Sequence, residues 1–170
     1  MPDPAATAPR PAGPSADWAA AGRSPVAAAM ASRDVRITSG ILAAACLALL
    51  SVAWWLDPSS EGLGTHTQLG LSECGWITGA DMPCPTCGMT TAFSHAADGD
   101  LAASFVAQPF GMILAVMTGI VVVVGGFTAA TGSTLAPFLA GMVGPRVGWL
   151  ALVLLLLAWG WKIVDHRGLL

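Results

Sequence analysis

The chain has 170 residues, of which 55% are hydrophobic and 10% are charged, and its formal net charge is −3. A typical soluble domain carries roughly 25% charged residues, because its surface must be covered with polar groups. The composition therefore argues against a soluble enzyme. Seven Lys and Arg residues are also too few for a nucleic-acid-binding protein. The composition instead indicates a membrane protein in contact with the lipid bilayer.

The N-terminal segment, residues 1–36, is rich in Ala and Pro and poor in large apolar side chains. Such a composition cannot bury enough apolar surface to offset the entropy of ordering. The sequence therefore predicts a disordered tail, followed by a membrane domain over residues 37–170. Arg33 and Arg36 directly precede the first apolar run, and the positive-inside rule places this tail in the cytoplasm.

Three apolar segments, at about 37–56, 110–130 and 147–164, are predicted to be transmembrane helices. The first is long enough to reach roughly 30 Å as a helix, which is the hydrocarbon thickness of a bilayer. It also suits a signal peptide cleaved near Ala53, but the Trp-Trp pair that follows and the later spans favour a retained helix. The predicted fold class is all-α, an integral membrane protein with three transmembrane helices.

Small residues recur every four positions in the second span, at Gly111, Ala115 and Gly119. They share one helix face, and small residues at this spacing let helices approach closely in lipid. The sequence therefore predicts a helix partner or a second copy of the chain on this face. A shorter apolar segment, residues 135–142, is predicted to lie at the interface, because joining it to the third span would bury Arg146 at a cost of about 2.5 kcal/mol or more.

The loop between the first two spans, residues 57–109, contains six acidic residues and no Lys or Arg. The positive-inside rule therefore predicts an external loop and a cytoplasmic N-terminus, in a multi-pass protein of the plasma (inner) membrane. Lys162 and Arg167 would then lie outside, against the rule.

Three of the four cysteines, Cys74, Cys84 and Cys87, lie in this external loop. The segment after the last of them is predicted to be a short helix over residues 89–97. Asp100 is predicted to be the N-cap of the helix that leads into the second span. Nearly all of the chain's polar chemistry is thus concentrated in one loop.

The cysteines allow three interpretations. A disulfide among them would stabilise the loop outside the cytoplasm. A zinc site could use Cys74, Cys84, Cys87 and His95, with His66 as the alternative fourth ligand. A thiol-disulfide oxidoreductase could use Cys84 and Cys87 with Cys74 as the resolving thiol. The sequence favours a structural or interaction role over an enzyme; it requires no cofactor and allows zinc.

The run Cys84-Pro85-Thr86-Cys87-Gly88-Met89-Thr90-Thr91-Ala92, with Gly99-Asp100 and Gln108-Pro109 after it, resembles the DUF2752 family of small bacterial membrane proteins. The signature of that family is Cys-Pro-x-Cys-Gly-x-Thr-Arg-Ala. The resemblance implies a multi-pass membrane architecture and no known activity. The chain departs from the pattern at three positions: Thr91 replaces Arg, Gln108 replaces Asn, and Gly75 follows Cys74 where Pro is common. An activity that requires this Arg is therefore not expected in this chain.

Overall fold

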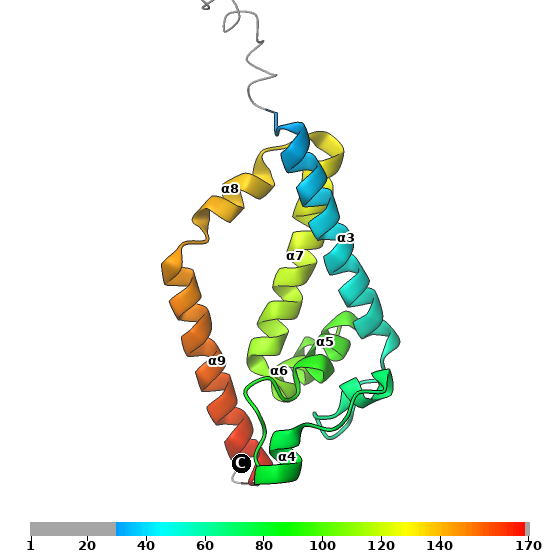
Figure 1. The fold of residues 1–170 in the computed structure, drawn as a ribbon, viewed down its shortest axis with the longest axis vertical. Coiled ribbons are helices and arrows are strands. Elements are labelled where there is room, and N and C mark those ends of the chain that lie inside the picture. The colour runs from blue at the N-terminus through cyan, green and yellow to red at the C-terminus, as the bar shows by residue number, and fades with distance from the viewer. Residues whose placement is uncertain (1–29, 169–170) are drawn as a thin grey trace, which may run out of the picture. The chain divides into compact units, whose positions relative to one another are not determined.

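The computed structural model describes residues 30–168, which contain helices and no strand. Ala31–Leu170 form one compact unit. The predicted all-α fold class is confirmed, whereas most of the predicted tail lies outside the described residues. The elements in chain order are α3 (Arg33–Trp55), the 3-10 helix η2 (Thr65–Leu69), α4 (Gly75–Ala80), α5 (Met89–Ala97), α6 (Leu101–Ala107), α7 (Pro109–Thr131), α8 (Leu135–Met142) and α9 (Pro145–His166) (Figure 1).

The three long helices α3, α7 and α9 are each long and apolar enough to cross a membrane, with mean hydropathies of 2.0, 2.4 and 2.0. They confirm the three predicted spans and a multi-pass membrane protein. α3 begins at Arg33, four residues before the predicted span, because the Ser32 hydroxyl accepts a hydrogen bond from the Val35 N–H and caps the helix. Local capping therefore extends this helix beyond its apolar stretch.

Close contact between α3 and α7 depends on small residues. A Cβ on Gly125 would lie 2.9 Å from the Ser39 carbonyl oxygen, and a Cβ on Gly40 would lie 3.3 Å from the Ala129 Cβ. At the same end, the Arg36 guanidinium donates hydrogen bonds to the Ala129 carbonyl oxygen at 2.9 and 3.1 Å. An arginine thus pairs with the negative C-terminal end of α7.

The predicted small-residue face of α7 is divided between two environments. A Cβ on Gly111 would lie 2.9 Å from the Ala92 Cβ of α5, and Ala115 is buried. A Cβ on Gly119 would meet no atom of another element within 4 Å, and Gly119 lines an open, mainly apolar groove of about 430 Å³ beside α3 and α5. A partner helix at Gly119 stays a prediction.

The segment between α3 and α7 folds into four short helices at one end of this pair (Figure 1). α5 covers the predicted range and packs against α3, α6 and α7. Asp100 caps α6, since its carboxylate accepts a hydrogen bond from the Ala103 N–H at 2.9 Å. α8 has the predicted bounds of the short apolar segment. The C-terminal end of α9 returns to the same end as α4 (Figure 1).

Candidate metal centre

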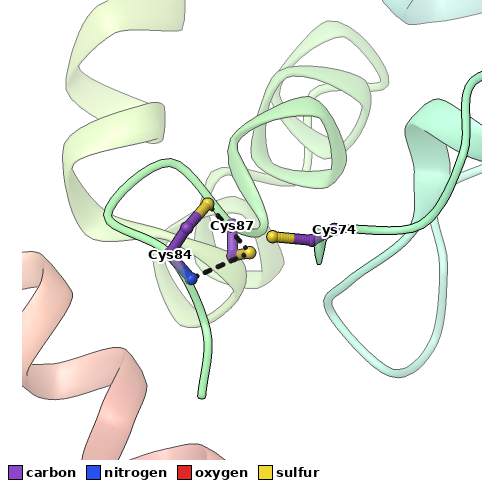
Figure 2. Close-up of side chains that lie close together, drawn as sticks. All are labelled: Cys74, Cys84 and Cys87. Atoms are coloured by element: carbon purple, nitrogen blue, oxygen red, sulfur yellow. Dashed lines mark hydrogen bonds between the residues drawn. The ribbon is translucent and has the colours of Figure 1, made fainter. Parts of the chain in front are cut away.

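Three thiols from two separate parts of the loop meet in one cluster. The sulfur atoms of Cys74, Cys84 and Cys87 all lie within 4.8 Å of one another. Figure 2 shows Cys74 approaching from one stretch of chain and the other two from the turn that leads into α5. Within residues 30–168 this is the only group of three or more Cys, His or acidic side chains close enough to hold one ion.

Local structure places two of these thiols in one turn. The Cys87 N–H donates a hydrogen bond to the Cys84 carbonyl oxygen at 3.0 Å, and the Cys84 N–H donates to the Cys87 sulfur at 3.2 Å. Pro83 and Pro85 restrict the backbone on both sides of Cys84. Gly88 then begins α5 with a φ of +85°, a conformation that disfavours any residue with a side chain.

The third thiol comes from the start of α4. Cys74 is the N-cap residue of this helix, and its carbonyl oxygen accepts hydrogen bonds from the Ile77 and Thr78 N–H groups. It is partly exposed, as is Cys84, whereas Cys87 is buried. The cluster is therefore open to the surroundings on the side of Cys74 and Cys84.

The surroundings push two of the thiol pKa values apart. Burial raises the pKa of Cys74, but the nearby backbone N–H of Trp76, the Cys87 thiol and the backbone N–H of Ile77 favour the thiolate and lower the pKa to about 7. Burial raises the pKa of Cys87 to about 12, and the neighbouring Cys84 thiol adds to this effect. The cluster thus holds one thiol prone to ionise beside one that stays protonated without a counter-charge.

The structure brings together three of the four predicted zinc ligands. His95 lies in the last turn of α5, six residues and roughly 9 Å of helical rise beyond Met89, and it is not in the cluster. The His66 ring is 3.2 Å from the Ser72 carbonyl oxygen and is likewise outside it. Cys46 lies within the α3 span. The assignment of a fourth ligand therefore stays a prediction.

A buried pair of hydroxyls links η2 to α5 and was not anticipated from the sequence. Thr91, at the position of the family's Arg, is 1% exposed, and its hydroxyl lies 2.8 Å from the hydroxyl of the equally buried Thr65. The Thr65 hydroxyl also accepts a hydrogen bond from the Ser59 N–H. In this chain a pair of neutral hydroxyls therefore occupies the place where the resemblance implies a cation.

A second departure from the family pattern, Gln108, supports the turn that carries Cys84 and Cys87. It is fully buried, and its side-chain N–H₂ donates a hydrogen bond to the Pro85 carbonyl oxygen at 3.1 Å. Since Pro85 lies between Cys84 and Cys87, this hydrogen bond ties the turn to the N-terminus of α7. The sequence marked Gln108 as unusual but gave no sign of its partner.

The C-terminal end of α9 contacts the same loop. The Trp159 indole N–H donates a hydrogen bond to the Pro83 carbonyl oxygen at 2.9 Å, and the ring meets Trp76 edge to face with 6.3 Å between centroids. Lys162 is 3% exposed, lies beside Gly62, and forms an ion pair with Asp165 at 3.0 Å. The sequence suggested only interfacial tryptophans here, because hydropathy cannot identify a hydrogen-bond acceptor that is distant in the chain.

Two kinds of chemistry suit this geometry. In a tetrahedral zinc site with Zn–S bonds of about 2.3 Å, neighbouring sulfurs lie about 3.8 Å apart. The observed separations, 3.1 Å between Cys84 and Cys87 and at most 4.8 Å for all three thiols, bracket that value. A disulfide requires about 2.05 Å, so a shift of about 1 Å would let Cys84 and Cys87 form one. All four cysteines are free thiols in the structure.

Comparison with known proteins gives one match. No curated protein and no solved structure matches the chain. Residues 76–122, from α4 to the middle of α7, match the family model described as "Protein of unknown function (DUF2752)". This segment includes Cys84 and Cys87, the buried Thr91 and Gln108, but begins just after Cys74. The match confirms the predicted resemblance: over residues 76–122 this multi-pass membrane protein carries the DUF2752 sequence pattern.

Proposed function

We propose that the protein binds one zinc ion through the thiolates of Cys74, Cys84 and Cys87, and that the ion holds the extramembrane loop in its folded shape. The convergence of three thiols from two chain segments carries this proposal. Soft thiolate ligands select zinc or Cu(I) over the hard cations. Zinc is favoured over Cu(I) because its two positive charges supply more of the counter-charge that the buried Cys87 needs to ionise beside two other thiolates.

Three protein ligands leave one of the four positions of zinc for another donor. The partly exposed Cys74 and Cys84 border the open side of the cluster, so a water molecule can occupy this position. This arrangement differs from a closed structural site with four protein ligands. The role proposed is structural, since the ion would join two separate parts of the loop, the segment of Cys74 and the turn of Cys84 and Cys87.

A reversible Cys84–Cys87 disulfide is the second candidate, and the 3.1 Å sulfur separation favours it. Oxidation would join these two sulfurs with loss of two electrons and two protons to an external disulfide or quinone. Cys74, whose pKa lies near 7, would be the thiol suited to attack that bond. The metal site ranks first because it uses all three thiols at once.

Zinc content tests the proposal directly. The purified full chain in detergent should contain about one zinc ion per molecule, and Cys87→Ser should lose it because one of three ligands is removed. Cys46→Ser is the matched control, since this cysteine lies in α3 outside the cluster. Elemental analysis together with intact mass measures both zinc and oxidation. A wild-type protein with a Cys84–Cys87 disulfide and no zinc would favour the second candidate instead.

We also propose that the cysteine loop faces the exterior of the plasma membrane. Arg33 and Arg36 lie at the opposite end of α3 from the loop, where Arg36 contacts the end of α7. This charge distribution supports a cytoplasmic N-terminus under the positive-inside rule.

Thiol labelling in intact cells tests this orientation. After treatment with a membrane-impermeant chelator, an impermeant maleimide should label Cys74 or Cys84 in intact cells, whereas Cys46 should react only after the membrane is dissolved. The Cys74→Ser/Cys84→Ser double variant provides the background. Labelling that requires cell lysis would place the loop in the cytoplasm.

A further inference from the structure

We propose that Trp159 is a positioning residue for the cysteine site, so that the docking of α9 and the binding of metal strengthen each other. This inference rests on the proposed metal site and assigns a role to a helix outside the family match. α9 is separated from the cysteine loop by the whole of α7 and α8 in sequence. Its influence on the site can therefore come only from tertiary contact.

The first contact is made with the peptide group that precedes a ligand. The Trp159 indole N–H donates to the carbonyl oxygen of Pro83 at 2.9 Å, and Pro83 is bonded directly to Cys84. Pro83 is buried, so its carbonyl oxygen cannot readily exchange this hydrogen bond for one to water. Hydrogen bonds to the backbone beside a metal ligand fix the ligand's orientation and tune affinity.

The second contact reaches the other chain segment of the cluster. Trp76 lies two residues after Cys74, and its ring packs against Trp159 at an interplanar angle of 72°. A single side chain of α9 therefore touches both stretches of chain that the metal would join. Metal binding would hold Trp76 and Pro83 in place around the Trp159 ring. In turn, the docked ring would hold Cys74 and Cys84 near each other.

α9 has few other contacts with the long helices, so the contacts of Trp159 with Pro83 and Trp76 matter for its docking. Among the long helices, α9 contacts chiefly α7. This contact is far less extensive than the contact between α3 and α7. The Asp81 carboxylate approaches the His166 ring at 3.6 Å on the same surface. Trp149 and Trp161 are 69% and 41% exposed, as expected for tryptophans that face lipid or the interface. Trp159 differs from them because its polar N–H is used inside the protein.

The cysteine turn is held from both sides. Gln108, at the start of α7, donates to the Pro85 carbonyl oxygen, and Trp159 of α9 donates to the Pro83 carbonyl oxygen. Cys84 lies between these two carbonyl groups. Coupling between two binding events is reciprocal, so a zinc ion that orders the turn must also favour the docked position of α9 by the same factor.

Zinc affinity in two tryptophan variants tests the inference. Trp159→Phe keeps an aromatic ring against Trp76 but removes the N–H donor. Loss of one hydrogen bond of about 1 kcal/mol corresponds to a zinc dissociation constant weaker by up to about fivefold. Trp161→Phe is the matched control and should bind zinc as the wild type does. Competition with a chelator of known affinity, on the full chain in detergent, gives both constants.

A second measurement separates positioning from general damage. In the wild type, zinc should slow hydrogen exchange in the C-terminal half of α9, and Trp159→Phe should abolish that difference while α3 and α7 exchange as before. Equal zinc affinity in Trp159→Phe and the wild type would overturn the inference and leave the metal site standing. A wild-type protein that does not bind zinc would overturn the metal site itself.

Discussion

Gly88→Ala is expected to destabilise the protein by about 3 kcal/mol and to disrupt the cysteine turn. A Cβ at this position would lie 2.8 Å from two backbone carbonyl oxygens, those of Ala107 and Gly62. Neither oxygen is at the end of a flexible side chain, so the backbone itself must move. Left-handed backbone costs a non-glycine residue about 1–2 kcal/mol, and overpacking adds a similar amount. Thermal unfolding in detergent, followed by circular dichroism, measures the loss.

Gly99→Ala provides the control for backbone conformation. Gly99 has the same φ of +85°, but a Cβ there would meet no atom within 4 Å. Its substitution should cost only the conformational part, about 1 kcal/mol. The difference in destabilisation between the two variants then measures how closely Gly88 approaches the carbonyl oxygens of Gly62 in the loop and Ala107 in α6. Equal destabilisation of the two would mean that this approach does not occur.

Gly125→Leu is expected to separate α3 from α7 and to cost about 2–3 kcal/mol. A Cβ on Gly125 would lie 2.9 Å from the Ser39 carbonyl oxygen and 3.2 Å from the Ala43 Cβ. Helices in lipid associate through close packing rather than through exclusion of water. A side chain that holds the backbones apart therefore removes the main source of their attraction. The unfolding midpoint in detergent and the monodispersity of the purified protein measure the effect.

The adjacent glycine provides the matched control for this prediction. A Cβ on Gly126 would meet no atom within 4 Å, so Gly126→Leu adds the same side chain to α7 but directs it away from α3. This variant should unfold close to the wild-type midpoint. If both leucine variants unfold alike, the contact between α3 and α7 does not depend on Gly125.

Sequence patterns predicted the helices well because the formation of a helix depends on residues that are close together in the chain. Apolar length identified α3, α7 and α9, the short helix α5 was predicted with its observed bounds, and capping chemistry identified Asp100 at the start of α6. The regular spacing of Gly111, Ala115 and Gly119 was less informative. Periodicity shows that residues share a helix face, but it does not show which element covers that face, and here α5 covers Gly111 while Gly119 lies open.

The candidate site was predicted in part. The sequence singled out Cys74, Cys84 and Cys87 because thiols concentrated in one loop are chemically conspicuous. It could not choose among metal, disulfide and free thiols, since that choice depends on distances between atoms. His95 is eight residues after Cys87, a spacing that places both residues on the same side of a helix. The rise along α5 nevertheless carries His95 away from the sulfur atoms.

The sequence by itself determined that the chain crosses a membrane with three helices and carries its reactive groups in one loop. Both properties follow from hydropathy and composition over short stretches, which the surrounding fold cannot change. Only the tertiary structure decided that three thiols converge, that the Thr65 and Thr91 hydroxyls pair, and that Trp159 reaches Pro83. These contacts join residues far apart in the chain, so their formation depends on how the helices pack and not on any local pattern.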